Sequence, residues 1–173
     1  IAKMTALRSQ SLDLKVIRQT AITLTDLAWP HLNKEHRALA IRYLAGAGWF
    51  VEDDTNEIYS LKGRDMSGLD LSGINLRFAN LRNASLKDSN LSGARLDKTN
   101  CSYADLQNTN LAMASLSEAE LHGTVFLDTD LSEANLTNAK LQLDKLVKDA
   151  KTTGAKLHKV YIGGGDLHIS DAR

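Results

Sequence analysis

The sequence predicts an all-β solenoid of parallel, square coils, with an N-terminal α-helical segment and a β-hairpin that cap the first coil. Three observations predict this architecture. A large apolar residue recurs at every fifth position from Leu71 to Leu146, a small residue precedes most of these centres by two positions, and a polar residue, often Asn or Asp, lies between them. Such regular self-similarity is typical of repeat proteins. Because 43% of residues are hydrophobic but only 5% aromatic, the core must be aliphatic.

The series of repeat centres has no gap, and Met66 and Leu61 extend its phase towards the N-terminus. Two centres depart from leucine. We expect Cys101 to be a small core residue rather than a reactive thiol, and Phe126 to add volume to the core. The sixteen centres are Leu71, Leu76, Leu81, Leu86, Leu91, Leu96, Cys101, Leu106, Leu111, Leu116, Leu121, Phe126, Leu131, Leu136, Leu141 and Leu146.

The five-residue period fits neither an isolated helix nor a flat strand. A helix turns by about 500° over five residues, which would scatter the centres around its axis, and a strand would send alternate centres to opposite faces. The pattern is satisfied if the backbone turns a corner at every repeat, so that four repeats close a square coil of about 20 residues. Each centre and its small partner then point into a narrow shaft, and successive coils stack about 4.8 Å apart.

Three stretches carry the repeat in its fullest form: Ala79-Asn80-Leu81, Ala104-Asp105-Leu106 and Ala134-Asn135-Leu136. They resemble the pentapeptide-repeat family, whose signature is A-(D/N)-L-x-x, and the resemblance covers roughly half of the chain. It implies the right-handed quadrilateral β-helix of that family, which we expect over residues 61–173.

The repeat changes phase by one residue after Leu146. We expect the segment Val147–Gly154 to hold the extra residue at a bulged corner, before the pattern resumes at Ala155-Lys156-Leu157 and again at Gly165-Asp166-Leu167. The coils should then continue to near the end of the chain without a capping helix. An uncovered end is an aggregation hazard in solenoids, and Ile1 is not an initiator methionine, so we expect the chain to be part of a longer one.

The N-terminal part of the chain shows helical spacing instead. Apolar residues from Thr5 to Trp29 predict a helix that Pro30 stops. Asn33 is well placed to cap a second helix, which Gly46 and Gly48 should end. One face of this second helix is expected to hold Leu39, Ala40, Tyr43 and Leu44.

A predicted capping hairpin completes residues 1–60. Trp49-Phe50-Val51 and Ile58-Tyr59-Ser60-Leu61 are typical of two strands, and the polar stretch from Glu52 to Glu57 is typical of the turn between them. Leu61 already lies in the repeat phase, so the hairpin should lead directly into the first coil. Trp49, Phe50 and Tyr59 are then expected to plug the open mouth of the shaft.

The charge balance argues against nucleic-acid binding. Lys plus Arg and Asp plus Glu both number 21, giving a formal net charge of zero, whereas nucleic-acid binders usually carry a basic surface. From Arg64 to Leu146 there are 8 basic and 11 acidic residues, a net charge of −3. Duplex DNA carries about one negative charge per 1.7 Å, so this surplus is too weak for a convincing mimic of DNA.

The residue pattern predicts no enzyme, and we expect no catalytic residue, no cofactor and no metal. A single cysteine excludes an internal disulfide framework. The five histidines lack the spacing of metal ligands, since His158 and His168, for example, should lie on opposite sides of one coil. Gly163-Gly164-Gly165 lacks the Lys-Ser/Thr and the helix that follow a phosphate-binding loop.

No membrane span is expected within this sequence, because the longest apolar stretch, Ala38 to Val51, is interrupted by Arg42 and is too short for a bilayer. We therefore expect a cytoplasmic protein. The stretches Lys34 to Trp49 and Ile58 to Gly63 are similar to a helical lead-in of some pentapeptide-repeat proteins, where it often follows a membrane-spanning region. A membrane tether upstream of Ile1 is thus an open alternative.

The fold favours a non-enzymatic protein-interaction or scaffold module, because a rigid rod presents surface residues at fixed spacing. The partner would be a protein, and the sequence leaves open both its identity and the oligomeric state of the chain. Some pentapeptide-repeat proteins protect DNA gyrase by resembling duplex DNA, so the resemblance implies a DNA-mimicking, gyrase-interacting protein as one alternative. The other alternative is a β-helix domain of a larger enzyme or bacterial effector.

A candidate interaction patch emerges from the outward positions, most of which are polar. Val125, Leu127, Leu143 and Val147 are aliphatic residues that the five-residue phase directs outward at neighbouring places, whereas Phe78, Tyr103 and Met113 are outward apolar residues that are more scattered. An exposed aliphatic cluster lowers solubility unless something covers it. Two explanations stay open: contact with a partner, or coverage by other segments of the same chain.

Overall fold

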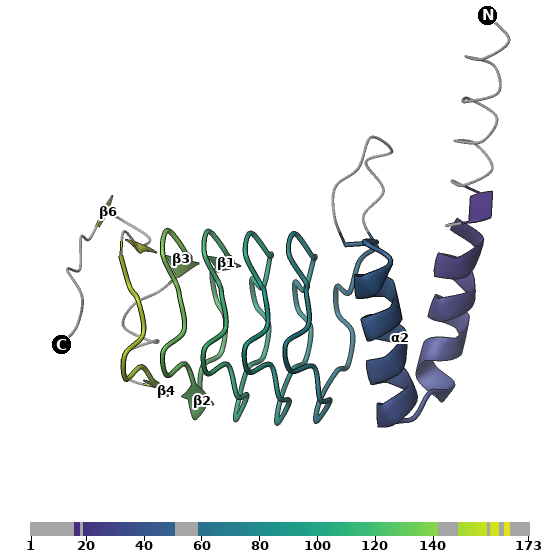
Figure 1. Cartoon of the computed structure of the whole chain (residues 1–173), viewed down its shortest axis with the longest axis horizontal. Coiled ribbons are helices and arrows are strands. Elements are labelled where there is room, and N and C mark those ends of the chain that lie inside the picture. Colours follow the sequence, from purple (N-terminus) through teal and green to yellow (C-terminus); the bar gives the residue numbers. More distant parts are fainter. Residues whose placement is uncertain are drawn as a thin grey trace, which may run out of the picture.

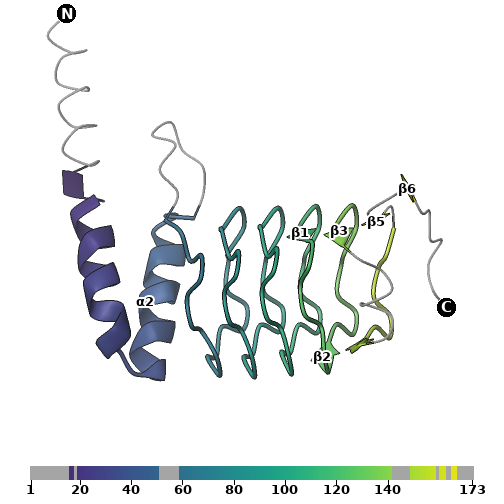
Figure 2. The same cartoon turned by 180° about the vertical axis from the view of Figure 1, so that it is seen from behind.

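The computed structural model describes residues 16–17, 19–50, 59–141, 149–158, 160–162 and 165–166. Along the long axis, a helical segment comes first, then helix α2 (Lys34–Gly46), then a stack of coils that ends near strand β6 (Gly165–Asp166) (Figure 1). The view from behind shows the same order (Figure 2). In both views α2 lies between the first helical segment and the first coil.

The N-terminal helices follow the predicted start and stop signals over the described residues. Residues 19–28 are helical, and they lead into a short 3-10 helix, η1 (Trp29–His31), which contains the predicted stop, Pro30. α2 begins after Asn33, whose side chain accepts a hydrogen bond from the backbone N–H three residues later at 2.9 Å. It ends at Gly46. The predicted caps of this helix are therefore confirmed.

The predicted apolar face of α2 is wrong for two of its residues. Leu39 and Tyr43 point to solvent, with 62% and 74% of their surface exposed, while Ile41 and Leu44 are buried in the core. The helix carries apolar residues on more than one side, so periodicity alone did not single out one face. Packing against the end of the coil stack selects the side with Ile41 and Leu44.

The coils repeat with a spacing of 20 residues over most of the ladder. Parallel bridges pair the residue before each centre with its equivalent in the next coil, from Ser60–Asn80 to Ser115–Asn135. Strand β1 (Glu120–Leu121) pairs in parallel with β3 (Lys140–Leu141) in the same register. Four five-residue repeats therefore close each coil, as the sequence predicts.

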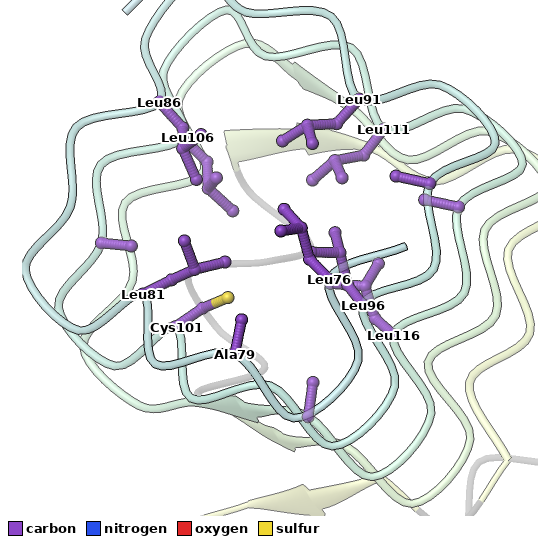
Figure 3. Close-up of a cluster of buried hydrophobic side chains, with 14 of the residues drawn as sticks. Leu76, Ala79, Leu81, Leu86, Leu91, Leu96, Cys101, Leu106, Leu111 and Leu116 are labelled. Atoms are coloured by element: carbon purple, nitrogen blue, oxygen red, sulfur yellow. The ribbon is translucent and has the colours of Figure 1, made fainter. Parts of the chain in front are cut away.

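The repeat centres fill the shaft of the coils. Every centre from Leu61 to Leu141 is at most 2% exposed, and centres of successive coils lie behind one another in Figure 3, as Leu91 and Leu111 do. Cys101 takes its place behind Leu81 and is fully enclosed. This burial confirms its interpretation as a core residue. Burial also raises the pKa of its thiol to about 11.

The extra residue of the C-terminal part lies between Leu141 and Ala150. Leu121 pairs with Leu141, 20 residues on, whereas Thr129 pairs with Ala150, 21 residues on. Strands β2 (Thr129–Asp130) and β4 (Ala150–Lys151) keep this longer register. Of the predicted segment Val147–Gly154, only its beginning therefore remains as a place for the extra residue.

The solenoid does not continue at Gly165-Asp166 as predicted. Strand β5 (Tyr161–Ile162) still pairs in parallel with β3, but β6 pairs antiparallel with β5. The chain therefore reverses after β5 instead of turning another corner. Only Gly163 and Gly164 link the two strands, and a two-residue Gly-Gly link is a favoured connection for such a reversal.

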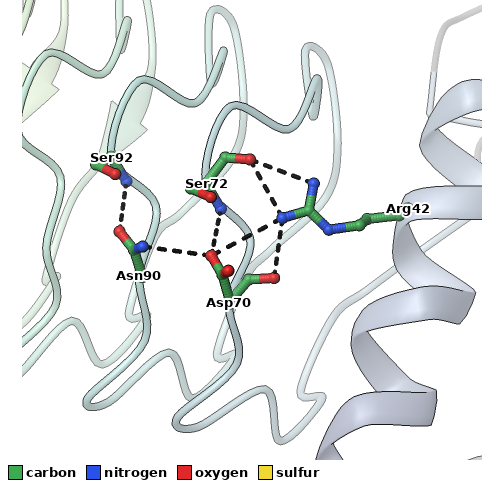
Figure 4. A network of polar contacts seen from close by, with 5 residues as sticks. All are labelled: Arg42, Asp70, Ser72, Asn90 and Ser92. Carbon is green, nitrogen blue, oxygen red and sulfur yellow. Dashed lines mark hydrogen bonds and ion pairs between the residues drawn. The ribbon is translucent and has the colours of Figure 1, made fainter.

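Two arginines of α2 join this helix to the first coil. Arg42 forms an ion pair with Asp70, with 3.8 Å between Nη2 and Oδ1, and also donates to the backbone carbonyl oxygens of Asp70 and Ser72 (Figure 4). Arg37 forms a second ion pair with Asp65 at 3.2 Å. Charged hydrogen bonds thus attach α2 to the backbone edge of the coil stack.

Aromatic residues close the mouth of the shaft. Phe50 and Tyr59 are almost fully buried, their ring centroids are 6.0 Å apart, and both belong to the same core as Leu61. Burial raises the pKa of Tyr59 to about 12. The backbone N–H of Tyr59 donates to the carbonyl oxygen of Trp49 at 3.0 Å. The predicted plug is confirmed for Phe50 and Tyr59. The first strand of the predicted hairpin is wrong where it is described, since Trp49 and Phe50 lie in a turn that follows α2. The predicted turn from Glu52 to Glu57 lies outside the described residues.

Candidate functional site

A local hydrogen bond explains why the residue before each centre is usually Asn or Asp. The side-chain oxygen of Asp105 accepts the backbone N–H of Gln107 at 3.1 Å, and that of Asn110 accepts the N–H of Ala112 at 3.0 Å. This bond satisfies a backbone donor at the corner that follows and stabilises the turn. A hydrophobic residue at such a position gives up this bond.

Val125 is such a residue. It pairs with Asp105 in the ladder but has no side-chain acceptor for the corner that follows. Leu127, two positions further on, stacks one coil beyond Gln107 and two beyond Lys87. Val125 and Leu127 are 42% and 44% exposed. We call these two residues the apolar pair.

The apolar pair lies on one wall of the rod, the wall whose centres are Leu86, Leu106 and Phe126. The backbone ladder does not involve these two side chains, because the N–H of Val125 donates to the carbonyl oxygen of Ala104 and the carbonyl oxygen of Leu127 accepts from Asn108. Shaft packing therefore does not require aliphatic residues at either position. The other two residues of the predicted patch, Leu143 and Val147, lie outside the described residues.

A polar cluster borders the apolar pair on the preceding coils. Lys87 Nζ lies 3.0 Å from Asp105 Oδ2 and 3.4 Å from Gln107 Oε1. Lys87 thus neutralises an acidic side chain of the next coil on this wall. The apolar pair replaces such a polar contact in the coil where it lies.

An aromatic cluster that the sequence pattern did not predict lies at the corner before the apolar pair. Tyr103 is 49% exposed, with the Arg82 guanidinium 4.9 Å from its ring centroid and the His122 ring edge-on at 5.9 Å. The ring covers Gly123, where an added Cβ would lie only 2.6 Å from Tyr103 Cδ1. The sequence does contain one signal of this cluster, because Gly123 follows Tyr103 by 20 residues, which is one coil.

Ion pairs between neighbouring coils neutralise most of the charge on the walls. Arg77 pairs with Asp97 at 3.5 Å, and Lys98 pairs with Glu118 at 3.5 Å. Lys140 Nζ lies 3.3 Å from a carboxylate oxygen one coil earlier. Acidic side chains are therefore balanced along the rod rather than gathered into one strongly negative face.

The described residues offer no group of three His, Cys, Asp or Glu side chains arranged to hold a metal ion. Within the same part of the chain, no helix has both the length and the apolar character needed to cross a bilayer. The described walls carry one aliphatic and one aromatic cluster, the apolar pair and the group around Tyr103.

Comparison with known proteins identifies the family to which the repeat belongs. A family model described as pentapeptide repeats, in eight copies, matches residues 65–100, 74–111 and 99–138. The chain belongs to the pentapeptide-repeat family. The matched ranges include the wall with the apolar pair and the corner with Tyr103. A search of curated proteins found no significant match.

Several solved pentapeptide-repeat structures are similar to this chain. One, from the thylakoid lumen of Arabidopsis thaliana, is 24% identical over 58% of this chain and 63% of its own, with a TM-score of 0.35. One from Nostoc PCC 7120 is 24% identical over 54% and 84%, with a TM-score of 0.42. One from Cyanothece 51142 is 31% identical over 53% and 58%, with a TM-score of 0.34. The chain thus spans less than two thirds of the first and third of these relatives.

Proposed function

We propose that this pentapeptide-repeat protein is a non-enzymatic protein-binding module that docks a partner protein on the apolar pair, Val125 and Leu127. The observation that carries the proposal is the exposure of two aliphatic side chains on a wall whose equivalent positions are polar. Exposed apolar groups on an otherwise polar surface are characteristic of interaction sites.

The hydrogen bond that Val125 cannot form in its own turn supports the proposal. The equivalent residue one coil earlier, Asp105, supplies the acceptor for the N–H of Gln107, and Val125 forgoes this bond. Positions where a sequence departs from a local rule without a packing gain are where functional sites are expected. Neither the packing of the shaft nor the backbone ladder involves these two side chains, whereas binding of a partner explains why they are aliphatic.

The two alternatives receive less support. A mimic of duplex DNA needs a dense negative surface, but cations from neighbouring coils pair with Asp97, Asp105 and Glu118. A role within a larger enzyme or effector does not explain why Val125 and Leu127 are aliphatic and exposed. Protein binding is the function that accounts for the aliphatic residues on this wall.

The test replaces the apolar pair with the residue types that the repeat itself uses. In Val125→Asn/Leu127→Gln, Asn restores the acceptor found at Asn110, and Gln is the residue at position 107. Wild type, this variant and a control, Met113→Gln, are used as bait for affinity capture from cells of the source organism. Met113 is 64% exposed at a different corner, so its replacement removes a similar amount of apolar surface elsewhere.

We expect the double variant to lose a protein that wild type and Met113→Gln retain, and a titration with that protein in purified form to reproduce the difference. Its free energy of unfolding should stay within about 1 kcal/mol of wild type. A larger loss of stability would show that the apolar pair is covered within the chain. Equal capture by all three baits would reject the apolar pair as a docking site.

A further inference from the structure

Arg82 is an exception among the cations of the coil walls. In the described stretch from residue 64 to 141, only two arginines, Arg82 and Arg95, have no carboxylate within ion-pair distance. The guanidinium of Arg82 instead lies over the ring of Tyr103. The other cations of this stretch all have acidic partners: Arg64, Arg77, Lys87, Lys98 and Lys140.

Tyr103 holds Arg82 in a defined orientation. The tyrosine is fixed by His122, edge-on at 5.9 Å, and by the backbone of Gly123, where its ring takes the space of a side chain. Stacking uses the face of a guanidinium and leaves the N–H groups on its edge free to form a fork of hydrogen bonds. Arg82 is therefore preorganised to donate to an anionic group that comes from outside the chain.

This corner adjoins the wall that carries the apolar pair. Gly123 lies two residues before Val125, and Tyr103 lies two residues before Asp105, which pairs with Val125 in the ladder. With about 3.3 Å per residue along a strand and about 4.8 Å between coils, one short segment of a partner could touch Arg82 and the apolar pair together.

The remaining charges of the wall indicate which anion it admits. Asp88 and Asp128 are exposed at the corner after the apolar pair, and Asp105 is matched only by Lys87. These carboxylates repel the backbone of a nucleic acid, which brings many phosphates together. A single carboxylate placed against Arg82 avoids them.

We propose that the docking segment of the partner is acidic and aliphatic, with a carboxylate that binds the guanidinium of Arg82 and an aliphatic side chain that packs on Val125 and Leu127. The inference rests on the proposed function and adds the chemistry of the partner. The arginine supplies direction and specificity through charged hydrogen bonds, and the apolar pair supplies buried surface.

The test is a selection of binders from a displayed library of random 12-residue peptides. Wild-type protein is the target, and Val125→Asn/Leu127→Gln is used for counter-selection. Enriched peptides are then synthesised, and their dissociation constants are measured by fluorescence anisotropy against wild type, Arg82→Gln, Arg82→Lys and Arg95→Gln. Arg95 is the matched control, since it is the other cation of the described stretch 64–141 without an acidic partner and precedes Leu96, on the side opposite Leu86.

Enriched peptides should combine Asp or Glu with Leu, Ile or Val. Arg82→Gln should weaken their binding by about tenfold or more, as expected for the loss of a charged hydrogen-bond pair, whereas Arg95→Gln should change it by less than about twofold. Arg82→Lys should retain part of the affinity, since it keeps the charge but loses the fork. Replacing the peptide's Asp by Asn should cause a matching loss on wild-type protein, a measurement independent of how the variant folds.

The outcomes separate the two proposals. Peptides that discriminate against Val125→Asn/Leu127→Gln but bind Arg82→Gln and wild type equally would overturn the acidic partner and leave the docking site standing. A selection that yields no peptide sensitive to the apolar pair would count against both. Tight binding of a duplex DNA oligonucleotide that Arg82→Gln abolishes would overturn the choice of a protein segment as the ligand.

Discussion

The guanidinium of Arg42 donates to the carbonyl oxygen of Ser72 from both terminal nitrogens, at 3.3 and 3.2 Å. One coil later, the equivalent carbonyl oxygen, that of Ser92, accepts the backbone N–H of Gly73 at 2.9 Å. Arg42 therefore takes the place of the backbone donor that a preceding coil would supply. Arg42 Nη2 also donates to the carbonyl oxygen of Asp70, at 3.1 Å.

Removing the arginine side chains of α2 should leave backbone carbonyl oxygens at the edge of the first coil without hydrogen-bond donors. In Arg37→Ala/Arg42→Ala, the carbonyl oxygens of Asp65, Asp70 and Ser72 lose their donors, and open backbone edges recruit other chains. We expect stronger concentration-dependent association than in wild type, measured by light scattering. The control, Lys62→Ala/Arg95→Ala, removes equal charge without touching this edge. Equal scattering from both variants would contradict the capping role.

Core packing in the shaft should depend on each repeat centre. Leu111 is fully buried between the equivalent centres Leu91 and Leu131, so Leu111→Ala should lower the free energy of unfolding by about 2–5 kcal/mol. Its neighbour Ala112 points outward where other coils carry serine, and Ala112→Ser should stay within about 0.5 kcal/mol. Chemical denaturation of both variants measures the difference, and equal losses would refute the assignment of inward and outward positions.

The side chains that stabilise the corners should make the fold sensitive to acid. Hydrogen bonds from Ser132 lower the pKa of Asp130 below its usual value. A lowered pKa in the folded state means that this stabilisation is complete above the unfolded pKa of about 3.9 and is lost as the pH falls through the folded value. Denaturation curves should therefore show a weaker loss of stability below about pH 4 in Asp130→Asn than in wild type.

The reciprocal variant provides the control. Asn110 precedes its centre one coil earlier in the same column and makes the same bond, to the N–H of Ala112. Asn110→Asp should keep the turn at neutral pH but add acid sensitivity. Identical pH profiles for wild type and both variants would show that these corner bonds do not govern acid stability.

Met113 should be replaceable with a gain in stability. Its φ is +59°, a left-handed conformation that costs an ordinary side chain about 1–2 kcal/mol. Asn tolerates this region better and already occupies it at Asn83, Asn108 and Asn138. We expect Met113→Asn to raise the free energy of unfolding by about 0.5–1 kcal/mol, whereas Met113→Ala keeps the strain and should bring no such gain. Thermal unfolding that ranks Ala above Asn would contradict this reason.

The candidate site was only partly visible in the sequence. The five-residue phase correctly directs Val125 and Leu127 outward, because this orientation depends only on the nearest repeat centre. The assembly of Arg82, Tyr103 and His122 was missed, since its members come from three successive coils and meet only through stacking. Leu143 and Val147 remain predicted members of the patch.

The sequence by itself determined the square coil, its 20-residue register and the residues that fill its shaft. Each coil contacts only its neighbours, so a short period is enough to specify the whole stack. Tertiary structure alone decided how the ends are closed: that α2 packs through Ile41, that Arg42 satisfies the first edge, and that β6 reverses onto β5. At both ends of the coil stack that the structure describes, arginine side chains and a reversed strand form the contacts that a further coil would make, and no five-residue pattern encodes them.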